Sequence, residues 1–145
     1  MRNKLAMVLV AMGSLALVSC GDDVVVPSDV TVPSAVVGEW WLVSFVRPDG
    51  SQVSITPSPE FSVRFGANGA MSIRVHCNSC GGSYQLQGEQ LTGDLGSCSW
   101  ARCTPSPVDV TFQDVFDGGS WVTRADELLR LTSDRGTLVL EPVSR

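Results

Sequence analysis

Short segments in which hydrophobic and polar residues alternate cover most of the chain after residue 36. Residues 61–65 and 71–75 alternate strictly, and residues 40–45 form an earlier hydrophobic run. A period of two is typical of β-strands with one buried face, and the glycine-rich and polar stretches between the segments mark turns. The pattern therefore predicts an all-β barrel or sandwich.

The positions of the hydrophobic residues also fix the length of the loop that follows Phe65. A two-residue loop would set Phe65 opposite the polar Ser72, which would pair a core position with a solvent-facing one. A three-residue loop over residues 67–69 sets Phe65 opposite Met71 and gives Gly69 the left-handed position after a type I turn. We therefore predict the longer loop.

Two further hairpins satisfy the same test. Leu86 faces Leu91 across a two-residue type II′ loop that begins with glycine. A four-residue loop over residues 133–136 sets Leu131 opposite Leu138. Three hairpins whose turn residues agree with their hydrophobic register predict an antiparallel β-meander.

One segment has a helical period instead. Ser106 is a suitable N-cap, Pro107 suits the first helical position, and Asp109 places an acid in the first turn. We predict a short α-helix over residues 107–117, packed on the sheet where it could plug one end of a barrel. Its apolar face would consist of Val108, Phe112, Val115 and Phe116. Its acids lack the spacing of a calcium loop, so we expect a solvated face at Asp109, Asp114 and Asp117.

Residues 1–19 have the three parts of a secretory signal peptide. Arg2 and Lys4 give the positive start, and residues 5–18 are apolar but too short to span a membrane. Leu-Val-Ser-Cys at the end resembles the lipobox of bacterial lipoproteins, which implies cleavage before Cys20 and acylation of Cys20. An ordinary signal peptide with an incidental cysteine is the alternative. Two or more acyl chains would anchor the protein stably to a membrane.

The residue after the lipidated cysteine and the segment that follows it suggest where the protein is held. Gly21 at this position resembles enterobacterial sorting to the outer membrane, which places the protein in the cell envelope, facing the periplasm. Residues 20–35 contain Val-Pro-Ser twice and read as an extended tether. An edge strand at residues 24–26 is the alternative. The remaining residues, 36–145, form the predicted domain.

The net charge of the chain limits the kinds of partner that we expect it to bind. The 145 residues carry 10 Lys plus Arg and 15 Asp plus Glu, a formal net charge of −5. Cleavage removes two of those cations and no acids, so eight cations against fifteen acids leave −7, with no lysine at all. This balance argues against nucleic acid as a partner. It also argues against electrostatic attraction to anionic lipid, so we assign membrane attachment to the acyl chains on Cys20.

Four cysteines remain in the predicted domain, and an even number in an exported chain favours disulfides. Because the chain doubles back between them, nested pairing, Cys77–Cys103 with Cys80–Cys98, is the first choice. Local pairing, 77–80 with 98–103, is the alternative.

A four-thiolate metal site is the competing interpretation of these cysteines. Cys-x2-Cys and Cys-x4-Cys could hold zinc or Cu(I), with His76 as a further ligand. The second spacing is loose for a zinc ribbon, and an exported protein meets an oxidising compartment, so we expect neither a metal nor a cofactor. His76 falls on the outward side of its strand and is expected at the surface. A thioredoxin-like role is weaker, because no βαβ pattern surrounds the cysteines.

Several motifs, taken in order, resemble the META domain family, the family of the heat-shock lipoprotein HslJ. Cys77-Asn78 followed by Gly-x-Tyr84, then a second cysteine before the helix, is the most specific part. The chain departs from the family at His76 and Ser99, where glycine and threonine are usual. The other matching segments are Gly38-Glu39-Trp40-Trp41-Leu42, Phe61-Ser62-Val63-Arg64-Phe65, Cys98-Ser99-Trp100-Ala101-Arg102-Cys103 and Leu138-Val139-Leu140-Glu141-Pro142.

The resemblance covers about residues 36–143 and implies a mainly β fold, a small lipocalin-like antiparallel barrel with one short α-helix. It also implies an envelope location and a loose link to stress or antibiotic tolerance, but no known ligand or reaction. By this match Cys77 and Cys103 are the family's motif cysteines and Cys80 and Cys98 an extra pair, which supports the nested pairing.

We do not expect an enzyme. The one histidine, His76, has no carboxylate placed by spacing to orient it, and no glycine-rich loop suits a phosphate. We predict a non-catalytic envelope lipoprotein whose domain binds an unknown protein or small ligand, with a thiol-based metal or redox sensor as the alternative. Trp40 and Trp41 are neighbours in a strand, so only one can face the core. Trp41 and Trp100 are candidate contact residues, unless both pack under the tether or the helix.

Overall fold

The computed structural model describes residues 35–104, 106 and 108–144. The predicted signal peptide, Cys20, most of the tether with its alternative edge strand, and Pro107 lie outside the described residues. In chain order the elements are β1 (Gly38–Val46), β2 (Gln52–Ser54), β3 (Phe61–Phe65), β4 (Ala70–Val75), β5 (Asn78–Gln87), β6 (Gln90–Cys98), α1 (Asp109–Phe116), β7 (Ser120–Ala125), β8 (Leu128–Ser133) and β9 (Gly136–Pro142).

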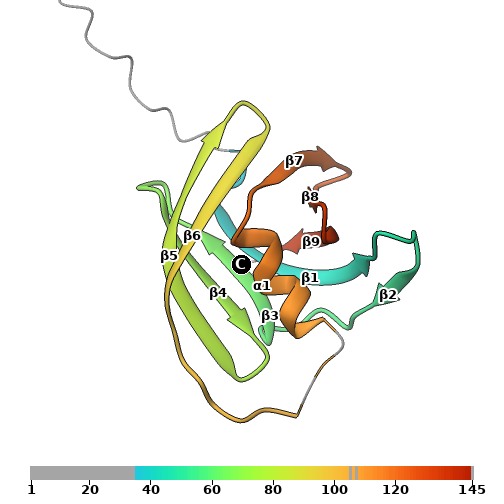
Figure 1. The fold of residues 1–145 in the computed structure, drawn as a ribbon. Helices are drawn as coiled ribbons and strands as arrows, with labels where there is room; N and C mark the ends of the chain where they lie inside the picture. Colours follow the sequence, from blue (N-terminus) through green and yellow to red (C-terminus); the bar gives the residue numbers. More distant parts are fainter. Residues whose placement is uncertain (1–34, 105, 107, 145) are drawn as a thin grey trace, which may run out of the picture. The chain divides into compact units, whose positions relative to one another are not determined.

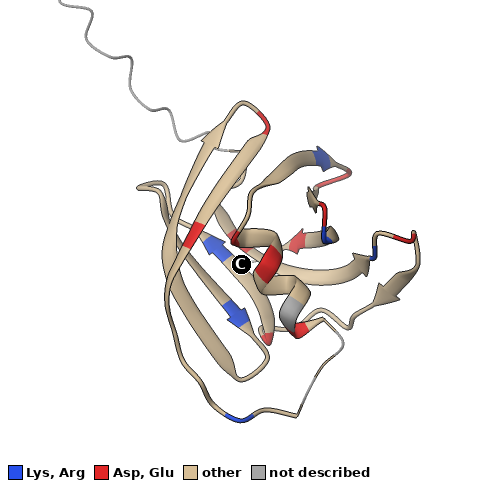
Figure 2. Cartoon of the chain, viewed as in Figure 1, with Lys and Arg blue, Asp and Glu red and all other residues tan. Residues whose placement is uncertain are grey.

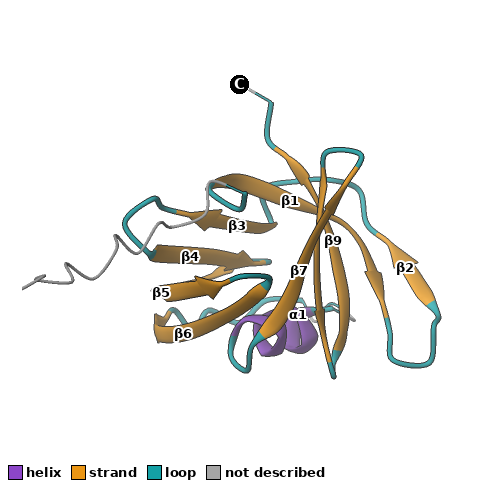
Figure 3. Ribbon diagram, turned by 90° about the horizontal axis from the view of Figure 1, so that it is seen from above, coloured by secondary structure: helices purple, strands orange, loops and turns teal. Residues whose placement is uncertain are grey.

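The strands form a closed antiparallel barrel. From β3 to β9 each strand pairs with the next along the chain, and β1 pairs with both β3 and β9, which closes a ring of eight strands (Figure 1). The short β2 pairs with the end of β1 beyond the reach of β3 (Figure 3). The predicted fold, an antiparallel meander closed into a small barrel with one short helix, is confirmed.

The three predicted hairpin registers are confirmed. Phe65 pairs with Met71, Leu86 with Leu91 and Leu131 with Leu138. Gly69 and Gly88 have φ angles of 80° and 61°, in the left-handed region that their turns require.

The predicted four-residue loop before Leu138 is wrong in length, although the register holds. Ser133 and Gly136 still pair, so only two residues form the turn. Gly136 has a φ of 131°, and a side chain there would collide with Phe45 and the carbonyl of Val46. The glycine therefore lets β9 approach β1 closely instead of ending the strand.

The helix begins later than predicted, at Asp109, and its N-cap is Val108 without a side-chain hydrogen bond. The Ser106 backbone N–H donates to Asp109 Oδ2 at 2.9 Å, which is one half of a capping box. The other half is missing, because the Asp109 N–H donates to the Ser106 carbonyl oxygen in a turn. The chain therefore makes a turn before it becomes helical.

The interior of the barrel is filled by apolar side chains. The predicted face of α1 is confirmed, since Val108, Phe112, Val115 and Phe116 are fully buried. The helix lies across the mouth of the barrel and packs against β4, β6, β8 and β9 (Figures 1 and 3). From the strands, the largest fully buried side chains are Leu42, Phe65, Ile73, Leu91, Leu129, Leu131, Leu138 and Leu140. Eight strands leave an interior that side chains can fill. In the described part of the chain, no helix has the length and hydropathy to cross a membrane.

Candidate binding surface

Two disulfides tie together one end of the sheet. Cys77, in the turn between β4 and β5, is bonded to Cys103 beyond β6, and Cys80 in β5 is bonded to Cys98 at the end of β6. This is the nested pairing, the first of the two arrangements considered above. The bonded cysteines are 26 and 18 positions apart in the sequence. Among the described residues, no group of histidine, cysteine and acidic side chains has the arrangement of a metal site.

Asn78 fixes the loop between the two bridged cysteines, residues 99–102. Its Oδ1 accepts hydrogen bonds from the Ala101 N–H at 2.6 Å and from Ser99 Oγ at 3.3 Å, and its Nδ2 donates to the Ala101 carbonyl at 3.2 Å. Ser79 and Ser99 add a bond from the Ser99 N–H to the Ser79 carbonyl. This role of Asn78 was not predicted, although an asparagine side chain beside the first cysteine can form hydrogen bonds with the backbone N–H and C=O groups of a loop.

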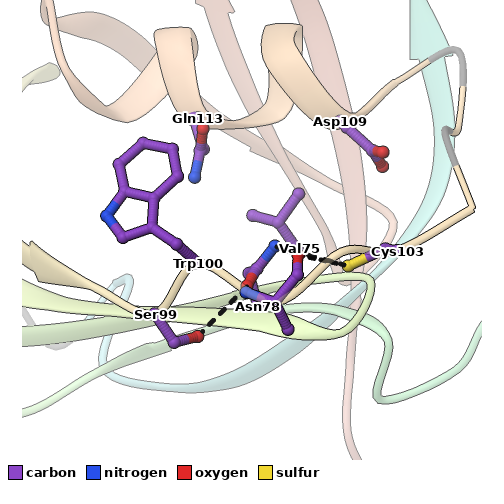
Figure 4. A pocket seen from close by; sticks show the side chains of 8 residues that line it. Val75, Asn78, Ser99, Trp100, Cys103, Asp109 and Gln113 are labelled. Carbon is purple, nitrogen blue, oxygen red and sulfur yellow. Dashed lines mark hydrogen bonds between the residues drawn. The ribbon is translucent and has the colours of Figure 1, made fainter.

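Trp100 lies in this fixed loop and is 89% exposed. Beside it is an open pocket of about 240 Å³ between the loop and α1 (Figure 4). In the figure Trp100 and Asp109 lie at opposite sides of this pocket, with Gln113 above and Val75 between them. The lining residues are Val75, Asn78, Ser99, Trp100, Ala101, Cys103, Asp109 and Gln113.

The two candidate contact tryptophans are not brought together. Trp40 faces the core, where its Nε1 donates to the Val36 carbonyl at 2.7 Å and Arg124 lies 5.2 Å from its ring. Trp41 points to the other side of β1 and is half-buried, and its Nε1 is buried without a hydrogen-bond partner among the described residues. It does not line the pocket beside Trp100.

Trp121 is an exposed aromatic residue that was not predicted. It is 59% exposed on β7, next to Val122, which faces the core. The alternation of Trp121 and Val122 after two glycines was the available signal for this strand.

The expectation for His76 is wrong. Val75 pairs with Asn78, so His76 lies in a two-residue turn, and its φ of 57° is left-handed. The strand parity used for the prediction does not apply in a turn. The ring is half-buried, stacks on Phe61 with 6.2 Å between centroids and 6° between planes, and has a buried Nδ1 without a partner among the described residues.

The Trp100 loop and the start of β1 lie at opposite ends of the sheet. Gly38, the first residue of β1, pairs with Phe65 beside the turn between β3 and β4. Cys77 lies in the turn at the other end of β4, whose six residues span about 20 Å. The start of β1 and the exposed Trp100 are therefore separated by about the length of a strand.

Near the β1 end, Tyr84 places a phenol hydroxyl in the core. It is buried, and its Oη donates to the Gly66 carbonyl at 2.8 Å. Burial raises the pKa of the Tyr84 phenol above its ordinary value of 10.0. The phenol is thus held neutral and serves as a hydrogen-bond donor.

Comparison with known proteins agrees with this architecture. The profile of the META domain family matches residues 34–144. No curated protein matches the sequence. Among solved structures, a Burkholderia xenovorans protein determined by NMR is similar at 20% identity and a TM-score of 0.55, over 74% of this chain and 83% of that one.

Two structures from Bacteroides are also similar. A lipocalin-like protein from Bacteroides uniformis has 17% identity and a TM-score of 0.51, over 75% of this chain and 99% of that one. A DUF4847 family protein from Bacteroides vulgatus has 11% identity and a TM-score of 0.56, over 77% and 96%. At these identities the likeness concerns the fold, which is a lipocalin-like barrel, as predicted.

Proposed function

The chain belongs to the META domain family, as its motifs indicated, and on this premise we propose that it is a lipid-anchored, non-catalytic envelope protein that binds a partner through the surface around Trp100. The observation that carries the proposal is an exposed indole on a loop fixed by Asn78 and two disulfides. Trp is enriched among residues that dominate binding energy, and a loop already ordered loses little entropy on association. A role in stress tolerance is supported only by the resemblance to the family.

The filled barrel favours a partner on the outside. Lipocalin-like barrels with an empty interior can hold one small ligand. Here Phe112 and Phe116 of α1 pack in the barrel, 5.3 Å apart between ring centroids, and both are fully buried. The contact is therefore assigned to the surface.

Acylation of Cys20 is the second part of the proposal. We expect the chain to fractionate with membranes when expressed with its own N-terminus, and Cys20→Ala to abolish both acylation and fractionation. A Cys20→Ala protein that still fractionates with membranes would show that the lipobox assignment is wrong.

The partner surface is tested by site-specific photocrosslinking in intact cells. A photoreactive amino acid at position 100 is expected to give a discrete adduct, while the same group at position 121 serves as the matched exposed control. Equal adducts from both positions, or none from position 100, would contradict the proposal.

The alternative, a thiol-based metal or redox sensor, is less well supported. All four domain cysteines are bonded in the structure, which leaves them no thiolate for a metal. Intact mass with and without reductant decides between them, because four thiols with a bound metal would favour the sensor.

A further inference from the structure

The pocket beside Trp100 has the size of one side chain. Its volume of about 240 Å³ lies below the ~300–1,000 Å³ of pockets that enclose small molecules. It is open to solvent, and the Trp100 indole that lines it is exposed. A group presented from another protein can therefore enter it, whereas a whole small ligand would remain largely uncovered.

The lining of the pocket favours a cation. The indole of Trp100 lies on one side of the pocket and Asp109 on the other (Figure 4), and because the indole is exposed, its π-face is accessible to an entering group. None of the eight lining residues is lysine or arginine. Aromatic faces attract cations, and carboxylates form charge-assisted hydrogen bonds with them.

One carboxylate oxygen of Asp109 has no hydrogen-bond donor among the described residues. Its Oδ2 accepts the Ser106 N–H, but its Oδ1 is buried and has no hydrogen-bond partner among the described residues. Buried carboxylate oxygens are nearly always paired. A donor that enters the pocket and reaches Oδ1 after a small rotation of the side chain would satisfy it.

The charge of the whole domain acts in the same direction. After the predicted cleavage the chain has a net charge of −7, and acidic positions lie along α1 (Figure 2). Arg102, the neighbour of Trp100, is exposed and does not line the pocket. Such a field attracts a cationic partner and repels anionic lipid.

We propose that this pocket binds a single arginine side chain of a partner protein, with the guanidinium between the Trp100 indole and the Asp109 carboxylate. Arginine fits better than lysine because its planar fork can stack on the indole and bond a carboxylate at the same time. This inference rests on the proposed function and names the chemistry of the partner at the same surface.

The test uses a blocked Gly-Arg-Gly tripeptide and the full chain in mild detergent, followed by NMR at the Trp100 indole N–H. We expect a saturable shift with a dissociation constant on the order of 1 mM. Gly-citrulline-Gly, which has nearly the same shape without the charge, should bind at least about tenfold more weakly. The Trp100 signal is assigned with Trp100→Phe.

Matched variants separate charge from structure. Asp109→Asn retains an acceptor for the Ser106 N–H and should weaken arginine binding about tenfold, whereas Asp114→Asn on the same helix should leave it unchanged. Equal binding of the citrulline peptide, no binding of the arginine peptide, or full binding by Asp109→Asn would each overturn the inference. A blue shift of tryptophan emission on phosphatidylethanolamine–phosphatidylglycerol vesicles that is absent in Trp100→Phe would also overturn it, because the surface would then bind lipid.

The crosslinking experiment distinguishes failure of this inference from failure of the proposed function. If Asp109→Asn keeps the adduct from position 100, the arginine inference fails and the binding surface stands. If position 100 gives no adduct at all, the proposed function fails as well.

Discussion

The interior of the barrel and its disulfide-linked end are built on different physical principles. In the interior, aromatic rings of α1 meet those of the sheet, as in the edge-to-face contact of Phe112 and Phe61, 5.9 Å apart between centroids. At the disulfide end, covalent bonds and the hydrogen bonds of Asn78 hold a loop whose aromatic residue, Trp100, faces solvent. Burial stabilises the first region, and cross-links keep the second ordered without burial.

This difference separates the residues that stabilise the fold from those that we propose bind a partner. A loop that needs no hydrophobic contact of its own can expose Trp100 and remain ordered. The barrel, in turn, has its core filled and supplies a rigid frame for that loop. Four substitutions test the contrast, from the largest expected effect to the smallest.

Phe112→Ala should destabilise the protein by about 3–5 kcal/mol, because it opens a cavity where α1 meets the barrel. Chemical denaturation measures the loss. Phe112→Leu is the matched control and should cost less than about 1.5 kcal/mol. If Phe112→Ala costs less than its control, α1 does not stabilise the core as described.

Replacing Cys77 and Cys103 together by serine should cost about 2–4 kcal/mol, since a bridge across 26 positions restricts the unfolded chain. Hydrogen exchange should show faster exchange in residues 99–102, while the centre of β3 and β4 keeps its protection. The paired replacement of Cys80 and Cys98 is the comparison, and peptide mapping without reductant checks the pairing. Equal loss of protection throughout the barrel would mean that the two regions are not independent.

Tyr84→Phe should cost about 0.5–1.5 kcal/mol near neutral pH, because the Gly66 carbonyl loses its donor. Its pH dependence is more informative. The folded-state pKa of Tyr84 is raised, so its contribution is complete below the unfolded pKa of about 10 and is lost as pH rises towards the folded-state pKa.

Denaturation at neutral and alkaline pH measures this effect, and phenolate absorbance follows the titration directly because Tyr84 is the one tyrosine in the chain. The Phe variant should lose less stability than the parent above about pH 10. Identical alkaline slopes for both proteins would exclude the raised pKa.

Trp100→Ala should change stability by less than about 0.5 kcal/mol, because the side chain is exposed. Its effect should instead be the loss of the partner adduct that a photoreactive amino acid at the exposed neighbouring position 102 gives in the parent protein. Denaturation and crosslinking on the same protein make the two measurements. A stability loss comparable to that of Phe112→Ala would show that Trp100 is structural.

Local patterns in the sequence were enough for most of the sheet. The registers of Phe65 with Met71, Leu86 with Leu91 and Leu131 with Leu138 follow from the period of two and from turn residues with positive φ. The strands β7 and β2 were missed. The turn between β7 and β8 uses Asp126 and Glu127, both with positive φ, and these residues give a weaker turn signal than asparagine and glycine.

Only part of the candidate site could be predicted from local patterns in the sequence. Trp100 could be named as a contact residue, but its pairing with Asp109 across a pocket depends on where α1 returns to the sheet. The error at His76 has the same origin. The inward–outward alternation of a strand stops at a turn, and the sequence did not fix the position of the turn after Val75.

By itself, the sequence determined the antiparallel meander, the apolar face of the helix and membership of the META domain family, because these depend on neighbours along the chain. The tertiary structure alone decided that β1 closes the barrel against β9 and that Asn78 and Asp109 lie beside Trp100. Contacts between segments that are distant in the sequence depend on how the whole chain packs, and local sequence patterns do not specify them.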